Sequence, residues 1–162
     1  MSTRTIHTES SLFFITFTCF DWLPLFQFTN TYNAVYKWFV YLKEKKNIKT
    51  TAYVIMPDHS HCILFFPSPN FSLNKILGNA KRFLAYEIIA RLETANQTEI
   101  LNQLASAVTE KEKRKGQKYK VFEESFDAKS IDNQKFFLQK LNYIHLNPCL
   151  PPGRLFAEII SW

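Results

Sequence analysis

Two of the 4 histidines in this 162-residue sequence stand two positions apart, as His59-Ser60-His61. They follow Pro57-Asp58 and precede an apolar run, so the pair is predicted to begin a strand near one end of a sheet. Side chains at i and i+2 of a strand share a face, about 7 Å apart, where two imidazoles can converge on one metal ion. Because H-x-H is short and arises by chance, an ordinary pair of hydrogen-bonded strand histidines is the alternative interpretation.

A phenol, an amide and an ammonium group share one face of the last predicted helix, residues 131–147. The apolar stripe expected to pack on the sheet comprises Phe137, Leu138, Leu141 and Ile144, and a second stripe about 130° away comprises Phe136, Lys140, Tyr143 and Asn147. Tyr143 and Asn147 are four residues apart and are therefore neighbours. The alternative is that Tyr143 lies at the edge of the core and that Asn147 merely ends the helix.

Composition narrows the class of protein. The net charge of +6 and the pI near 9.2 suit a polyanionic partner, although many proteins without one are equally basic. Only 3 glycines occur, so neither a Walker loop nor a dinucleotide fingerprint can be built. Cys19, Cys62 and Cys149 form no CxxC, which argues against a zinc ribbon or a disulfide framework. A cytoplasmic, soluble protein is expected, since no signal peptide or membrane span is evident.

The elements that must position these groups follow from periodicity and turn residues. Strands are predicted at 11–18, 50–56, 59–66 and 120–122, and helices at 31–46, 73–92 and 131–147. The first six match the ferredoxin-like split βαβ arrangement, an α+β fold. Its antiparallel sheet would have helices on one face and a free face for a ligand, with a C-terminal helix carrying Tyr143. We expect a single domain over 1–162, with 95–118 as a mobile insertion.

Two segments, YVIMPDHSHCILFF and KLNYIHLNP, resemble the two signatures of the REP-associated tyrosine transposases, within the single-tyrosine HUH superfamily. HUH denotes a His, a hydrophobic residue and a His. The segments FFITFTCFDWLPLF and VFEESFDAKSI and the helix with Lys81-Arg82 also resemble family segments, so the likeness covers most of 12–148. The sequence departs from the pattern at Ser60, which should point away from a metal ion. It also departs after Asn147-Pro148, where Arg154 would have to replace the usual arginine.

This resemblance implies a transposase that cuts single-stranded DNA through a 5′-phosphotyrosine intermediate at hairpin-flanked sites. Tyr143 would be the nucleophile, and His59, His61 and Asn147 would bind Mg²⁺ or Mn²⁺. The expected partners are single-stranded or hairpin DNA and, in some relatives, a second copy of the chain. The candidate DNA-binding residues are Lys75, Lys81, Arg82, Lys140 and Arg154. The basic run 111–120 either contacts phosphates or is a solvated, flexible loop.

Three other functions remain open at this stage. The chain could be a non-catalytic DNA-binding relative with the same fold. It could be a metal-dependent phosphoesterase that uses water, with Tyr143 only structural, or a plain interaction module. Metal binding, a covalent DNA adduct and DNA binding distinguish these functions from a transposase.

Overall fold

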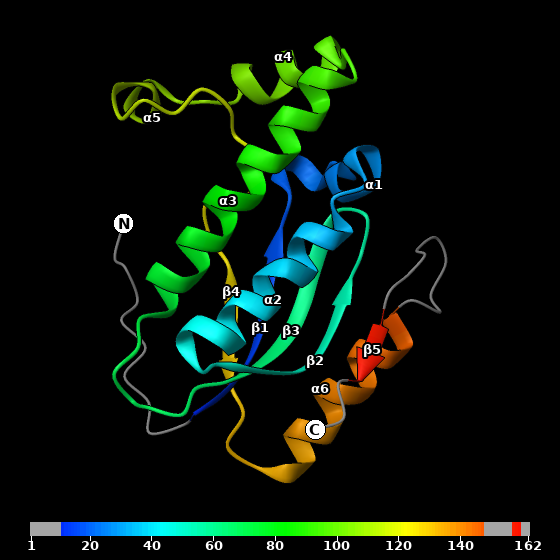
Figure 1. The fold of residues 1–162 in the computed structure, drawn as a ribbon, viewed down its shortest axis with the longest axis vertical. Helices are drawn as coiled ribbons and strands as arrows, with labels where there is room; N and C mark the ends of the chain where they lie inside the picture. Colours follow the sequence, from blue (N-terminus) through cyan, green and yellow to red (C-terminus); the bar gives the residue numbers. More distant parts are fainter. Residues whose placement is uncertain (1–10, 148–156, 160–162) are drawn as a thin grey trace.

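The computed structural model describes residues 11–147 and 157–159, which form one antiparallel sheet and its covering helices (Figure 1). In chain order the elements are β1 (Leu12–Thr18), η1 (Phe20–Trp22), α1 (Leu25–Thr29), α2 (Tyr32–Lys46), β2 (Lys49–Ile55), β3 (His59–Phe65), α3 (Leu73–Thr94), α4 (Thr98–Ser106), α5 (Glu110–Arg114), β4 (Asp127–Ser130), α6 (Gln134–Leu146) and β5 (Ala157–Ile159). The strand order is β4-β1-β3-β2-β5. Its first four strands, with α2 and α3 as the connecting helices, confirm the predicted ferredoxin-like arrangement.

One face of the sheet is packed against α2 and α3, which cross it in Figure 1. Alternation in β1 sends Phe13, Ile15 and Phe17 to this face, where all three are buried. The buried stripe of α3, which recurs at helical spacing, consists of Leu73, Leu77, Ala80, Leu84, Ile88 and Leu92. Ser72 caps that helix, because its hydroxyl accepts the backbone N–H of Lys75. This face therefore holds the main hydrophobic core, as the periodicity predicts.

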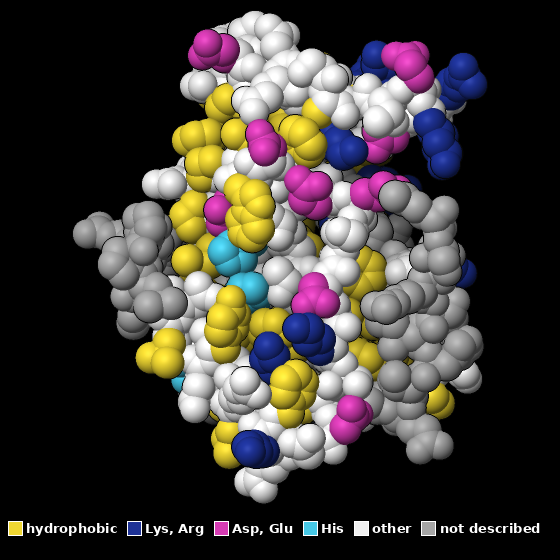
Figure 2. All heavy atoms as spheres, turned by 180° about the vertical axis from the view of Figure 1, so that it is seen from behind, with side chains coloured by type: hydrophobic (Ala, Val, Ile, Leu, Met, Phe, Trp, Pro, Cys, Tyr) yellow, Lys and Arg dark blue, Asp and Glu magenta, His cyan; other side chains and the backbone are white. Residues whose placement is uncertain are grey.

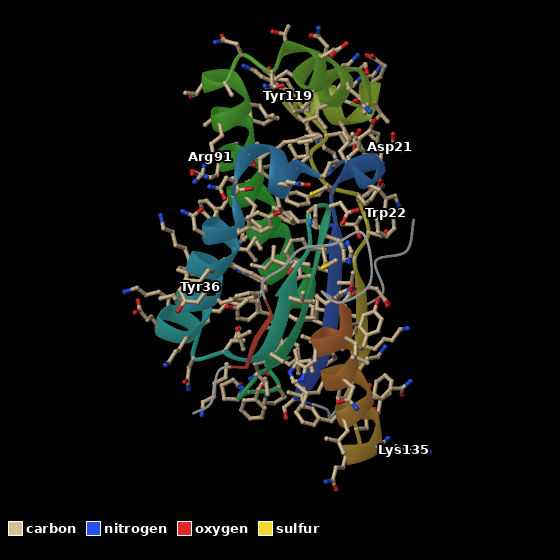
Figure 3. All side chains as sticks on the ribbon, turned by 90° about the vertical axis from the view of Figure 1, so that its right-hand side faces the viewer. Asp21, Trp22, Tyr36, Arg91, Tyr119 and Lys135 are labelled. Atoms are coloured by element: carbon tan, nitrogen blue, oxygen red, sulfur yellow. The ribbon has the colours of Figure 1, made fainter. Side chains whose placement is uncertain are left out.

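The opposite face was predicted to be free, and this expectation is wrong over part of its area. There α6 packs on a smaller buried cluster that includes Phe14, Val54, Ile63 and Ile144. Figure 3 views the sheet nearly edge-on and shows α6 on the side opposite α2 and α3. The physical reason is that a helix with an apolar stripe buries that stripe on the nearest apolar surface, here the alternate residues of β1, β2 and β3. A ligand would therefore reach this face only beside α6.

The fourth strand is not where the sequence predicts it. Residues 120–122 make only a single bridge, between Phe122 and Cys19, whereas the strand that pairs with β1 is Asp127–Ser130. The segment 95–118 contains α4 and α5, and Leu104 of α4 is buried in the main core. The backbone N–H of Lys120 donates to the carbonyl of Leu104 at 2.9 Å. Ile100 and Leu101 also pack against the main core, so α4 is attached to it, and the mobility of the segment stays a prediction.

Two further features bear on the class of protein. No helix within the described ranges is both long enough and apolar enough to span a lipid bilayer. Cys19 and Cys62 are free and fully buried, and burial raises the pKa of both thiols far above the ordinary value. Neither thiol is therefore a nucleophile at neutral pH. Cys149 lies outside the described residues.

Candidate active site

The histidine pair begins β3 on the face that α6 covers in part. Thr18 is the strand partner of His59 and Thr16 that of His61. Both rings therefore project from a central strand of the sheet, close to one end of that strand. Their ring centroids are 4.7 Å apart. Ser60 points to the other face, where it is buried and its hydroxyl donates to the carbonyl of Val54. The predictions that the two histidines share a face and that Ser60 points away are both confirmed.

Each imidazole is held through its Nδ1 atom. The Nδ1 of His59 lies 2.6 Å from a carboxylate oxygen of Asp58, and the Nδ1 of His61 lies 2.6 Å from the hydroxyl of Thr16. An ionised carboxylate can only accept, so Nδ1 of His59 carries the hydrogen, and in the neutral ring Nε2 keeps a lone pair. When His61 likewise donates from Nδ1 to Thr16, its Nε2 is also free. This pattern is common among metal-binding histidines, whose other ring nitrogen donates to a nearby oxygen.

His61 is the more enclosed of the two rings. It is 6% exposed, and the ring of Phe14 stacks on it with centroids 5.4 Å apart. Burial, aided by the neighbouring His59 and Lys140, lowers the pKa of His61 to about 3. His61 is therefore a neutral imidazole at physiological pH, which is the form that binds metal ions.

Tyr143 of α6 reaches the same place from the helix. Its hydroxyl lies 3.4 Å from Nε2 of His61, and their ring centroids are 5.1 Å apart. The side chain of Tyr143 is 45% exposed, so its hydroxyl is not sealed inside the core. Lys140, one turn earlier, places its ammonium 4.5 Å from the ring centroid of Phe14 and 5.5 Å from that of Tyr143. Figure 2 shows histidine side chains near the middle of this face, with basic side chains close by.

The helix that carries Tyr143 is turned slightly from the predicted orientation. Leu138, expected to pack on the sheet, is 46% exposed, whereas Asn147 from the polar stripe is buried. Leu138 lies about 100° around the helix from Phe137, on the side away from Tyr143. Rotation toward the polar stripe therefore exposes Leu138 and brings the Tyr143 and Asn147 side of the helix nearer the sheet.

Lys81 was predicted to contact DNA, and the structure gives its ammonium other partners. It donates to the carbonyl oxygens of Glu123, Glu124 and Ser125 at 2.8, 3.2 and 3.0 Å. An ammonium has three N–H groups, so these three bonds can occupy all of them. Burial lowers the pKa of Lys81 to about 8, and the Glu123 and Glu124 carboxylates oppose that shift. Lys81 therefore anchors the segment that precedes β4.

The other predicted DNA contacts are divided between the two layers. Lys75 and Arg82 lie on α3, which packs on the opposite face of the sheet from the histidines. Arg82 lines a groove of about 620 Å³ between α2 and α3. Lys140 shares the face of His61 and Tyr143. Arg154 lies outside the described residues. Only Lys140 of the described candidates is therefore brought to the histidine–tyrosine cluster.

The donors present fit a metal ion that accepts nitrogen ligands. Within the described part of the chain, no group of three or more His, Cys, Asp or Glu side chains could hold a metal ion. A site here would consist of the two imidazoles, with the amide of Asn147 and phosphate or water oxygens completing it. Mg²⁺ prefers oxygen ligands, whereas Mn²⁺ binds more strongly to nitrogen-containing sites. This set therefore favours Mn²⁺ as the experimental probe.

Sequence reasoning missed four residues around the site, namely Phe14, Thr16, Trp22 and Asp58. Phe14 and Thr16 alternate with core residues on β1, and this period-2 pattern could have placed them on the histidine face. Asp58 directly precedes His59, so its contact could have been suspected. Trp22 packs edge-on against His59, with centroids 5.7 Å apart, and no local pattern indicates that contact.

The comparisons with known proteins bear on the fold. No family model and no curated protein sequence matches the chain. Among solved structures, a REP-associated tyrosine transposase bound to a REP hairpin is similar at a TM-score of 0.63 and 17% identity, over 92% of this chain and 73% of that one. A Deinococcus radiodurans protein proposed to be a transposase is similar at a TM-score of 0.52 and 11% identity, over 90% and 96% of the two chains. The predicted resemblance is thus confirmed for the fold, which this chain shares with these two proteins.

Proposed function

We propose that this protein is a metal-dependent transposase that cuts and rejoins single-stranded DNA through Tyr143. The observation that supports it most is the 3.4 Å approach of the Tyr143 hydroxyl to Nε2 of His61, beside the second imidazole of His59. A phenol next to two imidazoles that can bind a metal ion is an arrangement suited to phosphoryl transfer. The similarity in fold to a tyrosine transposase supports the same reaction class.

His59 and His61 would hold the metal ion through Nε2, with Asn147 as a third ligand. Asp58 and Thr16 would keep the two rings in the required orientation through Nδ1. A bound Mn²⁺ or Mg²⁺ would act as a Lewis acid on the scissile phosphate.

In the reaction, the Tyr143 oxygen forms a bond to phosphorus and the bond from phosphorus to the 3′ oxygen breaks. The phenol loses its proton, and the 3′ oxygen gains one to become a free 3′-OH. The Lys140 ammonium, 5.5 Å from the ring centroid of Tyr143, would attract the oxygens of the scissile phosphate. The phosphotyrosine is itself a phosphodiester, so a second 3′-OH can reverse the exchange without ATP. This chemistry suits strand transfer better than hydrolysis.

Hairpin-flanked single-stranded DNA is the proposed substrate, because the similar transposase is bound to a REP hairpin. A hairpin oligonucleotide with a single-stranded flank is incubated with protein and Mn²⁺ and examined on a denaturing gel. Wild-type protein should form a covalent protein–DNA band. Tyr143→Phe should form none, and EDTA or His59→Ala should abolish the band as well.

Tyr36→Phe is the matched control, because Tyr36 is 47% exposed, like Tyr143, but lies on α2 across the sheet. It should form the band at the wild-type level. A band that persists in Tyr143→Phe would contradict the assignment of the nucleophile. Cleavage with repeated turnover and no adduct would instead indicate a water-using phosphoesterase. DNA binding without any Mn²⁺-dependent thermal shift would indicate a non-catalytic relative.

A further inference from the structure

Trp22 is an exposed aromatic side chain beside the histidines, with no part in the reaction proposed above. Its side chain is 63% exposed, and its indole packs edge-on against His59 with ring centroids 5.7 Å apart. Four rings thus follow one another, from Trp22 through His59 and His61 to Tyr143. Trp22 lies at one end of this row and the nucleophile at the other. In Figure 3 Trp22 lies on the same side of the sheet as α6.

The backbone of Trp22 adopts a conformation that few side chains favour. Asp21 and Trp22 have φ of 51° and 54°, two successive left-handed residues that are not glycine. Such a conformation persists only where the surroundings impose it. Here the N–H of Asp21 donates to the Glu123 carboxylate at 2.9 Å, and the N–H of Trp22 to the carbonyl of Cys19 at 3.2 Å.

The turn is also connected to the histidine site and to Lys81. The N–H of Cys19 donates to the carbonyl of Asp58 at 2.7 Å, and the Asp58 carboxylate holds His59. Lys81 fixes the carbonyls of the segment that contains Glu123. These bonds hold the indole at a defined place beside His59 although most of its surface faces solvent. A left-handed backbone at two non-glycine residues, held in place beside the histidines, marks this turn as a candidate functional position.

We propose that Trp22 is a stacking platform for one base of the single-stranded DNA, next to the scissile phosphate at the His59 and His61 site. This inference rests on the proposed function and deepens it by naming where a base would bind. An indole face accepts any base, so the contact would add affinity with little sequence preference. The position one ring beyond His59 suits the nucleotide that neighbours the scissile phosphate, not that phosphate itself.

Affinity for a fluorescent single-stranded oligonucleotide tests the proposal independently of cleavage. All proteins carry Tyr143→Phe, so no phosphotyrosine forms and the DNA stays intact, and Mn²⁺ is present in every titration. Trp22→Ala should weaken binding about 5- to 150-fold, which is the range for loss of one base–aromatic stack. Trp22→Phe should restore part of the loss. Trp22→Asn removes the ring but tolerates the left-handed backbone, so it should match Trp22→Ala if the ring is what matters.

Tyr86→Ala is the matched control, because Tyr86 is 65% exposed but lies on α3. It should bind like the Tyr143→Phe parent. Single abasic positions are then moved along the oligonucleotide. At one position near the cleavage site, removal of the base should weaken binding to the parent protein. The same removal should not change binding to the Trp22→Ala protein, since the stack is already absent.

The outcomes separate this proposal from the proposed function. If the parent protein binds no single-stranded DNA, both fail. If it binds, but Trp22→Ala and Trp22→Asn bind equally well, the stacking platform is wrong and the transposase assignment stands. The same holds if no abasic position loses its effect in the Trp22→Ala protein. If an abasic position depends on Trp22 but the protein with Tyr143 intact forms no adduct, the base site is supported and only the transposase assignment is overturned.

Discussion

The two faces of the sheet are built from alternate residues of the same strands, yet one face packs the core and the other carries the candidate site. On β1, Phe13, Ile15 and Phe17 face α2 and α3 and are fully enclosed. On the other face, Phe14 and Thr16 support His61, and α6 covers only part of the surface. The strand period of two residues thus separates a packing surface from a chemical surface in one short segment.

This difference implies that substitutions on one face should change stability, whereas substitutions on the other face should change function. A substitution on the α2 and α3 face should change unfolding and leave metal and DNA binding intact in the folded molecules. A conservative substitution on the histidine face should do the reverse. The site tolerates its polar groups because each is bonded, as Asp58 to His59 and Thr16 to His61 show.

The largest expected effect is on the packed face. Phe17→Ala should lower the free energy of unfolding by about 3–5 kcal/mol, because a fully buried ring that contacts three other aromatic rings leaves a cavity. Urea denaturation measures this loss. At a temperature where the variant is still folded, its affinity for Mn²⁺ should equal that of wild type. A large change in that affinity would show that the faces are coupled.

The second effect is on the histidine face and concerns metal affinity. Thr16→Val removes the hydroxyl that holds Nδ1 of His61, and loss of such a partner lowers metal affinity about 10- to 100-fold. Mn²⁺ titration followed by thermal shift or calorimetry measures it. Thr50→Val is the matched control, because the buried Thr50 hydroxyl has no hydrogen-bond partner among the described residues. It should leave Mn²⁺ affinity unchanged, so equal losses in both variants would refute the role of Thr16.

The alternation of residues between the two faces made part of the site predictable from the sequence. The strand period placed His59 and His61 together and turned Ser60 away, and the helical period put Tyr143 beside Lys140 and Asn147. These predictions succeed because each depends on local geometry within one element. The sheet order followed from the order of strands and helices along the chain.

The predictions that failed depend on contacts between distant segments. Asp127–Ser130 has weak strand propensity, but pairing with β1 imposes a strand, whereas the more apolar residues 120–122 make only a bridge. Lys81 is basic, as a phosphate contact should be, but its partners are carbonyls more than 40 residues away, the first at Glu123. The contact of Trp22 with His59 likewise needs the folded turn. Composition and periodicity carry no information on such pairings.

A smaller effect concerns the pH dependence of stability in the absence of metal. The pKa of His61 is about 3 in the folded protein, below the ordinary value near 6.5 expected after unfolding. The unfolded chain therefore binds more protons as pH falls below 6.5, so stability is lost toward pH 3. Between pH 6 and pH 5, wild type in EDTA should lose about 1 kcal/mol more than His61→Gln. Equal slopes for the two proteins would mean that His61 is not enclosed as described.

The smallest effect tests whether DNA follows the histidine face alone. Lys140 lies beside Tyr143, whereas Lys75 and Arg82 lie on α3 across the sheet. Each phosphate that a cation neutralises contributes about 0.7 to the slope of log affinity against log salt for single strands. Lys140→Gln should therefore reduce the slope for single-stranded DNA by about that amount, while Lys75→Gln and Arg82→Gln should leave it unchanged. If the α3 variants reduce the slope as much as Lys140→Gln does, the DNA passes over both layers. The histidine face would then carry the reaction, but both faces would bind DNA.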